Sequence, residues 1–124
     1  MKLNSFPQVS GSTDTTLKVW DLSIQPEWSS IGCKATMTGH SDTVRCVRMR
    51  SSLDKVISGS YDATIKAWSL SDGRLLATLR GHEGRVICLS WDDDDDGEEE
   101  TLLSGSTDQS IKVIRPTHQT QGET

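Results

Sequence analysis

Short runs rich in Val, Ile, Leu and Thr alternate with clusters of turn residues through the middle of the chain. Four runs are predicted strands: Thr43–Met49, Lys55–Ser60, Thr64–Ser69 and Arg74–Leu79. Tight turns are predicted at Tyr61-Asp62-Ala63 and Ser71-Asp72-Gly73, because Asp can bond its own backbone and Gly allows positive φ. No window sustains an apolar period of 3.6, so no helix is expected. The pattern predicts an all-β fold built from four-stranded antiparallel sheets.

The same pattern occurs three times along the chain. Ser10–Trp20 (SGSTDTTLKVW) returns as Ser58–Trp68 (SGSYDATIKAW) and as Ser104–Ile114 (SGSTDQSIKVI), at offsets of 48 and 46 residues. A Gly-His pair also repeats, at Gly39-His40 and Gly81-His82. A period of about 40–45 residues indicates a stacked or radial repeat architecture. Repeats of this kind usually build surfaces that hold partners, which favours binding over catalysis.

These repeated residues resemble the WD-repeat family, whose units form the blades of β-propellers. The markers are the Gly-His pair, a small-residue strand before an Asp turn, and a Trp six residues after that Asp. Asp14/Trp20 and Asp62/Trp68 fit this spacing, whereas the third unit has Ile114 where the Trp is expected. The resemblance therefore predicts propeller blades and a binding function.

The resemblance implies a boundary for the repeats and an open ring. It covers residues 9–116, so residues 1–8 are expected to be a ragged N-terminus and residues 117–124 a disordered tail. Ser23–Gly32 is expected to be a long, mobile connection. About two and a half blades cannot close a ring, since propellers typically have four to eight. We therefore expect the chain to be part of a longer propeller or to self-associate.

In that family a hydrogen-bonded set of His, Ser or Thr, Asp and Trp stabilises each blade. By position, the middle unit has this set at His40, Ser58, Asp62 and Trp68. The third unit has it at His82, Ser104 and Asp108. These four side chains can form one hydrogen-bonded network. An Asp carboxylate accepts hydrogen bonds, a His ring can both donate and accept, a Ser hydroxyl can bridge two partners, and a Trp indole only donates. The third network lacks the Trp donor and is expected to be weaker.

Composition and charge argue against several classes of function. The net charge is −5, but eight of the 18 acids lie in Asp92–Glu100, and the remainder is only mildly basic. A nucleic-acid binder would be strongly basic, and no stretch approaches the ~18 apolar residues of a membrane span. Cys33, Cys46 and Cys88 have no CxxC spacing and fit reduced thiols. We expect no nucleic-acid partner, no membrane insertion, no cofactor or metal, and a cytoplasmic or nuclear location.

His40, Ser58 and Asp62 have the side-chain types of a hydrolase triad. Catalysis would require an exposed Ser beside an oxyanion hole, and the sequence has no GxSxG nucleophile elbow. The structural network explains the same three residues and also Trp68. The sequence therefore predicts a non-enzymatic chain.

The acidic run Asp92–Glu100 lies between two further predicted strands, Val86–Trp91 and Thr101–Ser106. Its spacing matches the start of a calcium-binding EF-hand loop, but the position of the final acid holds Leu103. We interpret the run as a solvated hairpin loop. The alternative is an acidic docking strip for a basic partner.

Within the WD-repeat family, Gly39–Met49 is most similar to the F-box substrate receptors of ubiquitin ligases. In that class, phosphorylated peptides bind on a narrow face through an Arg that begins the inner strand and through residues just before the turn Asp. These positions correspond to Arg45, Tyr61 and Thr107 here. The alternative for Arg45 is an ordinary solvated strand residue. The acidic run is expected on the opposite face.

The resulting hypothesis is a protein–protein interaction scaffold that recognises a protein or peptide partner, with or without a phosphate group. Within it, the specific role would be substrate recognition in a ubiquitin-ligase adaptor. The alternative is a regulatory or targeting WD-repeat module of a larger enzyme or trafficking protein.

Overall fold

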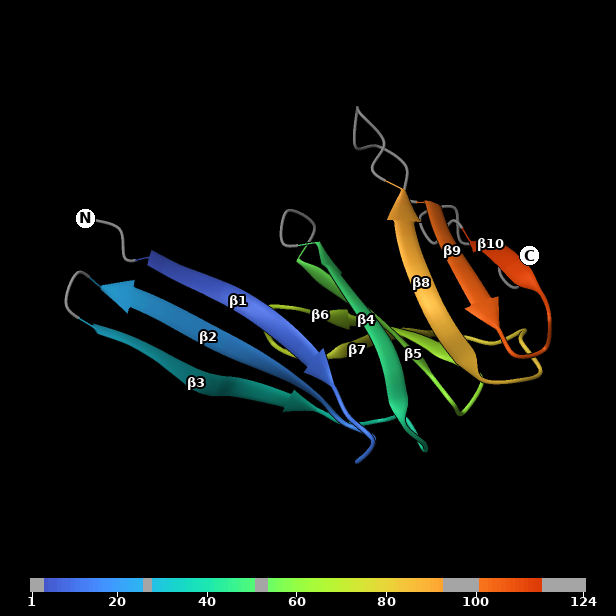
Figure 1. Cartoon of the computed structure of the whole chain (residues 1–124), viewed down its shortest axis with the longest axis horizontal. Coiled ribbons are helices and arrows are strands. Elements are labelled where there is room, and N and C mark those ends of the chain that lie inside the picture. Colours follow the sequence, from blue (N-terminus) through green and yellow to red (C-terminus); the bar gives the residue numbers. More distant parts are fainter. Residues whose placement is uncertain (1–3, 26–27, 51–53, 93–100, 115–124) are drawn as a thin grey trace.

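The computed structural model describes residues 4–25, 28–50, 54–92 and 101–114. Ten strands and no helix occur in these ranges, arranged as three antiparallel sheets that follow one another along the chain (Figure 1). None of these residues belongs to a helix long and apolar enough to cross a membrane. The predicted all-β class is confirmed.

The middle sheet is a complete four-stranded blade. Its order is β4 (Val44–Arg50), β5 (Lys55–Ser60), β6 (Ile65–Ser69) and β7 (Leu75–Leu79). All pairs are antiparallel and each strand lies within one residue of its predicted bounds. The four-stranded antiparallel blade is therefore confirmed.

The first sheet has the order β1 (Asn4–Gly11), β2 (Leu17–Gln25) and β3 (Trp28–Met37). The expected mobile connection over Ser23–Gly32 is wrong, because β2 and β3 stay paired as far as Gln25 and Trp28. This long hairpin gives backbone N–H and C=O groups partners that a solvated loop would have to find in water. β1 begins at Asn4, inside the segment expected to be a ragged N-terminus.

The third sheet has the order β10 (Ile111–Ile114), β9 (Thr101–Ser106) and β8 (Val86–Asp92), so β10 is an edge strand. Residues 93–100 of the acidic run and the tail at 117–124 lie outside the described residues. Within the described ranges the three sheets do not close into a ring. The structure is consistent with an incomplete propeller.

Three equivalent turns join the repeated strands, each at the predicted Asp. The residue after the Asp has a positive φ in all three: Thr15 (78°), Ala63 (74°) and Gln109 (71°). The Asp carboxylate accepts a backbone N–H from the residue two positions on, namely Thr16, Thr64 and Ser110. This local bond fixes a left-handed turn without requiring Gly.

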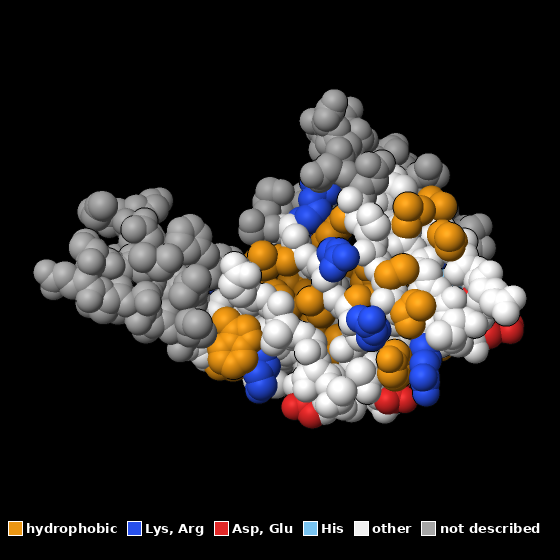
Figure 2. All heavy atoms as spheres, viewed as in Figure 1, with side chains coloured by type: hydrophobic (Ala, Val, Ile, Leu, Met, Phe, Trp, Pro, Cys, Tyr) orange, Lys and Arg blue, Asp and Glu red, His pale blue; other side chains and the backbone are white. Residues whose placement is uncertain are grey.

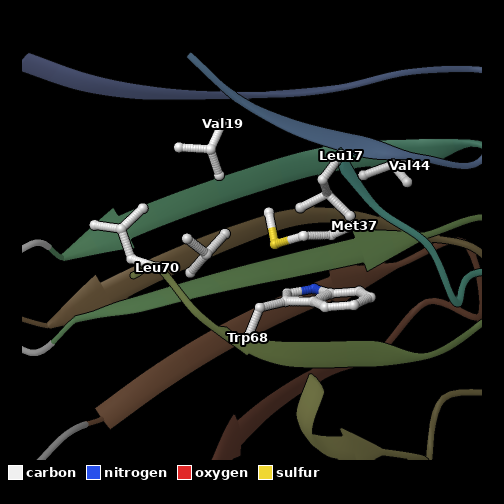
Figure 3. Packing of buried hydrophobic residues seen from close by; sticks show 7 residues of the cluster. Leu17, Val19, Met37, Val44, Trp68 and Leu70 are labelled. Atoms are coloured by element: carbon white, nitrogen blue, oxygen red, sulfur yellow. The ribbon is translucent and has the colours of Figure 1, made fainter. Parts of the chain in front are cut away.

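Two apolar clusters hold the sheets together, one on each face of the middle sheet. The first, between the first and middle sheets, consists of Leu17, Val19, Met37, Val44, Val56, Trp68 and Leu70 (Figure 3). The second, between the middle and third sheets, consists of Ile57, Ile65, Ala67, Val86, Leu89 and Leu102. Full burial of each large aliphatic side chain contributes roughly 1.5–3 kcal/mol. The middle blade is therefore the most firmly held of the three.

Candidate functional site

A buried hydrogen-bonded network joins the loop before β4 to strands β5 and β6. The His40 Nδ1–H donates to Asp62 Oδ2 over 2.9 Å, and His40 Nε2 lies 2.7 Å from Ser58 Oγ. The Trp68 Nε1–H donates to the same Ser58 oxygen over 2.9 Å. Because His40 donates through Nδ1, its Nε2 accepts and the Ser58 hydroxyl donates to it. The four side chains thus form one chain of bonds from the indole to the carboxylate.

Burial and hydrogen bonding shift the pKa of both ionisable members of this network. Burial alone would raise the pKa of Asp62, but bonds from Thr64, Ser41 and His40 outweigh it and hold that pKa well below its usual range. Burial lowers the pKa of His40, although the bond to Asp62 opposes the shift. The pair is therefore a neutral imidazole beside a carboxylate at neutral pH.

The third sheet repeats most of this network. His82 Nδ1 lies 3.0 Å from Asp108 Oδ2, and His82 Nε2 lies 2.8 Å from Ser104 Oγ. Ile114 stands where an indole would donate to Ser104. The described part of the first sheet has the Trp but no His. There the Trp20 Nε1–H donates to Ser10 Oγ over 2.9 Å. Among the described residues, only the middle sheet has all four members of the network.

This geometry is unsuited to nucleophilic catalysis. Ser58 is completely buried, with an exposed fraction of 0%, and its oxygen contacts both His40 and Trp68. A substrate carbonyl could not approach that oxygen without opening the blade. The triad interpretation of Ser58 is therefore wrong.

The three predicted partner-binding residues lie toward one end of the strands. Figure 1 shows that β4 and β8 begin at the same edge as the β5–β6 and β9–β10 turns, whereas β8 ends at the opposite edge. Arg45 is exposed in a bulge near the start of β4. Tyr61 is half-buried and Thr107 is exposed in the two turns. The hairpin end at Asp92 is thus remote from these residues along β8.

A fourth residue, Arg85, joins two of the three. Its guanidinium carbon lies 4.4 Å from the centroid of the Tyr61 ring. Its backbone N–H donates to Thr107 Oγ1 over 3.0 Å, and the Thr107 N–H donates to the Arg85 carbonyl over 2.9 Å. Within the described ranges, no hydrogen bond, ion pair or cation–π contact joins Arg45 to Tyr61 or Thr107. We define the turn-end surface as Arg45, Tyr61, Arg85 and Thr107.

Sequence reasoning missed Arg85 because the repeats align it with Thr43. The position in the third repeat that corresponds to Arg45 holds Ile87, so alignment of the repeats does not place a cation there. The sequence feature that could have pointed to Arg85 is Gly84, which directly precedes it. A Cβ at Gly84 would lie 2.6 Å from Thr107 Oγ1, so a glycine there lets the backbone approach the turn.

The electrostatic character of the described surface near β4 is basic. Figure 2 shows Lys and Arg side chains in a row along β4, with hydrophobic side chains on either side, and acidic side chains at the lower and right edges of this view. β4 itself contributes Arg45, Arg48 and Arg50. Among the described residues, neither Arg45 nor Arg85 forms an ion pair with a carboxylate.

The described residues offer no metal site, because no group of three or more His, Cys, Asp or Glu lies close enough together to hold an ion. Cys33, Cys46 and Cys88 are all free thiols. Burial, and secondarily the neighbouring Cys88, raises the pKa of Cys46 to about 11. Cys46 is therefore a protonated thiol that packs against the second core cluster.

The chain is similar to several known proteins. Residues 31–69 and 73–115 match the family described as WD domain, G-beta repeat. The chain is 37% identical, over 85% of its length, to the DENN domain and WD repeat-containing protein SCD1 of Arabidopsis thaliana, and covers 8% of that protein. It is 42% identical, over 66% of its length, to the F-box/WD repeat-containing protein sel-10 of Caenorhabditis elegans, and covers 13% of it.

A third relative is the U3 small nucleolar RNA-associated protein 15 homolog of Gallus gallus. The identity is 31% over 94% of the chain, which spans 20% of that protein. The chain thus spans only a small part of each of these relatives. The matched residues include both Gly-His pairs and both complete His–Ser–Asp sets, and the chain belongs to the WD-repeat family.

Proposed function

We propose that the turn-end surface binds a protein or peptide partner through an anionic group, such as a phosphorylated side chain. WD-repeat proteins are generally non-enzymatic interaction modules, so a partner surface is the coarse expectation for the family. The observation that carries the finer proposal is the pair of guanidinium groups, Arg45 and Arg85, that lack carboxylate partners among the described residues. Planar guanidinium groups bind phosphate and carboxylate groups in bidentate geometry.

The contacts of Arg85 support this role. Stacking on the Tyr61 ring fixes one face of its guanidinium and leaves its N–H edges for a ligand. The backbone bonds to Thr107 fix the start of β8, so the side chain extends from a held position. A preorganised cation loses less conformational entropy when it binds an anion.

The biological role that we propose is substrate recognition in a ubiquitin-ligase adaptor. The 42% identity to an F-box/WD repeat-containing protein supports it. A second candidate is a regulatory or targeting module of a larger protein, favoured by the 37% identity to a DENN domain and WD repeat-containing protein. A cytoplasmic or nuclear location stays a prediction.

Self-association is a further part of the proposal. Leu103, Ile111 and Val113 on the third sheet have exposed fractions of 40%, 75% and 43%. Apolar side chains in neighbouring positions on one sheet favour a partner that covers them. Light scattering on the purified chain should give a mass above 13.6 kDa, and a strictly monomeric chain would contradict this part.

The partner proposal is tested with an array of peptides, each present with and without a phosphorylated Ser or Thr. The wild-type chain should bind a subset of the phosphorylated peptides more tightly than their unmodified forms. Arg85→Ala and Arg45→Ala should each weaken that binding roughly tenfold, because each removes charge-assisted hydrogen bonds.

Two matched controls separate this effect from general loss of charge. Lys34→Ala removes an exposed cation from β3, away from the turn-end surface, and should leave binding unchanged. Replacing Asp92–Asp96 with Ser and Gly should also have little effect. Loss of binding with the acidic run, together with unchanged binding in both Arg variants, would instead favour the acidic docking strip.

A further inference from the structure

The outer strands of the first and middle sheets, β3 and β7, share the residues that pair within each sheet. In the register of the sheets, residues 35–37 of β3 (Ala-Thr-Met) correspond to residues 77–79 of β7 (Ala-Thr-Leu). In each sheet the Thr hydroxyl accepts a hydrogen bond from the Lys directly opposite, Lys18 in the first sheet over 3.1 Å and Lys66 in the middle sheet over 2.9 Å. These shared residues therefore serve the pairing of each outer strand with its inner neighbour.

The remaining positions of the two outer strands differ. The positions held by Gly32, Cys33, Lys34 and Thr38 in the first sheet hold Arg74, Leu75, Leu76 and Arg80 in the middle sheet. All four residues of the middle sheet are exposed, and the exposed fractions of Leu75 and Leu76 are 42% and 44%. Lys is one of the residues that protect an edge strand from pairing with another chain. β7 therefore has an apolar side chain where β3 has such a Lys.

The outer edge of β7 has a row of backbone groups that no described strand pairs with. β7 is the fourth strand of the complete sheet, and the chain passes from its end directly to β8 of the next sheet. In the same way β3 leads directly to β4. In both sheets that have this outer strand, no described strand lies beyond it. The open edge of β7 therefore follows from the order of strands in the blade, and it leaves N–H and C=O groups for another strand.

Two cations flank the exposed leucines, one at each end of β7. Arg74 and Arg80 are six residues apart, which is about 20 Å along an extended strand. Among the described residues neither guanidinium forms an ion pair, and the neighbouring Asp72 carboxylate accepts the Arg74 backbone N–H over 3.1 Å. Pairing of two β7 edges would place Arg beside Arg in either strand direction, and like charges opposite each other are destabilising. The charges therefore favour an acidic partner over a second copy of the chain.

We propose that the outer edge of β7 binds an extended segment of a partner protein as an additional strand. The segment has aliphatic side chains that pack beside Leu75 and Leu76, and a carboxylate near each end that pairs with Arg74 or Arg80. Backbone hydrogen bonds supply affinity in such strand addition, and side chains at fixed register supply specificity. Because one cation lies at each end of β7, the charges suit either strand direction.

This site is separate from the turn-end surface and does not rest on the proposed function. β7 is the outermost strand of its sheet, whereas Arg45 lies on β4 at the other edge of that sheet. Arg45→Ala should therefore leave strand binding unchanged. Conversely, Leu76→Gln should leave the binding of phosphorylated peptides unchanged. Failure of one proposal can thus be distinguished from failure of the other.

The test uses fluorescein-labelled peptides and the full chain. The peptide EVTVTVE has the proposed pattern, and KVTVTVK reverses both end charges. Fluorescence anisotropy at low salt should show that EVTVTVE binds roughly tenfold more tightly than KVTVTVK, because two ion pairs replace two repulsions. This difference should shrink in high salt, since the charges are exposed. The double variant Arg74→Glu/Arg80→Glu should reverse the preference.

Two further changes test the apolar contact and the strand geometry. Leu76→Gln should weaken binding of EVTVTVE roughly fivefold, because it removes apolar surface that the peptide would bury. Ile87→Gln is the matched control, since it replaces an apolar side chain with an exposed fraction of 36% on β8 and should leave binding unchanged. The peptide EVTPTVE should bind roughly tenfold more weakly than EVTVTVE, because Pro has no backbone N–H to donate.

Hydrogen exchange locates the bound peptide independently of these variants. Amides of Leu75–Leu79 that exchange rapidly in the free chain should become protected when EVTVTVE is added. Absence of binding at millimolar peptide, equal affinity for EVTVTVE and KVTVTVK, or protection confined to other strands would overturn the proposal. Binding that appears only after removal of residues 115–124 would overturn it in favour of that segment. A light-scattering mass that falls in Leu76→Gln would overturn it in favour of a second copy. If a variant fails to fold, the three peptides on the wild-type chain still decide the question.

Discussion

The guanidinium of Arg85 stacks on the ring of Tyr61, 4.4 Å from its centroid, and so connects the third sheet to a turn of the middle sheet. We predict that this pair couples the two blades energetically. Because the pair lies at the surface, its coupling energy should be about 0.5–1 kcal/mol. A double-mutant cycle with Arg85→Leu and Tyr61→Leu, in which stability is measured by urea unfolding, gives that coupling energy. Additive effects of the two variants would show that the stacking contributes nothing to stability.

Trp68 should stabilise the middle blade through its indole N–H as well as through packing. Trp68→Phe keeps an aromatic ring but leaves the buried Ser58 oxygen without its donor, so the free energy of unfolding should fall by about 1–3 kcal/mol. Trp20→Phe is the matched control, because it removes the same bond to Ser10 at a more exposed site where water can replace it. Urea midpoints that shift equally in the two variants would contradict the role assigned to burial.

Much of the blade could be predicted from the sequence because its determinants are local. The turn at Asp62, the strand lengths and the spacing of His40, Ser58 and Trp68 are all determined by residues within one repeat unit. The cross-strand hydrogen bonds from Lys18 to Thr36 and from Lys66 to Thr78 were not predicted, because the two partners are 18 residues apart in the first sheet and 12 in the middle sheet. Since the hairpins differ in length, the sequence does not reveal that the two pairs occupy equivalent positions in their sheets.

The residues that make up the turn-end surface were predicted only in part. Arg45, Tyr61 and Thr107 followed from position within the repeat, and the structure links two of them through Arg85. That link depends on which residues face each other across neighbouring sheets. No pattern within a single repeat encodes this contact. Alignment of the repeats therefore placed Ile87, and not Arg85, at the position that corresponds to Arg45.

Close packing between blades should make Gly59 intolerant of even one added carbon. A Cβ there would lie 2.6 Å from Val86 Cγ1 and 2.8 Å from Cys46 Sγ, at the contact between the middle and third sheets. Gly59→Ala should therefore destabilise the chain by about 1–3 kcal/mol through overpacking. Gly32→Ala is the control, because no atom lies within 4 Å of its added Cβ. A Gly59→Ala variant as stable as Gly32→Ala in urea would show that the sheets can separate freely.

Stability should fall as the pH drops from 7 towards 5, and His40 should be one cause. Burial lowers the pKa of His40 in the folded chain below its ordinary value of 6.5, against the opposing bond to Asp62 and with a small contribution from Lys66 in the same direction. Below about pH 6.5, His40 therefore binds a proton more readily in the unfolded chain than in the folded chain. The free energy of unfolding decreases as a result.

Asp62 should contribute in the same direction but in a lower pH window. Its pKa is depressed in the folded chain, so its stabilisation is present above about pH 4 and is lost as the carboxylate becomes protonated in more acidic solution. The two groups can therefore be separated by pH. His40→Gln should flatten the slope of unfolding free energy between pH 7 and pH 5 while leaving the loss below pH 4 in place. A His40→Gln variant with the wild-type slope between pH 7 and pH 5 would show that this histidine is not desolvated in the folded blade.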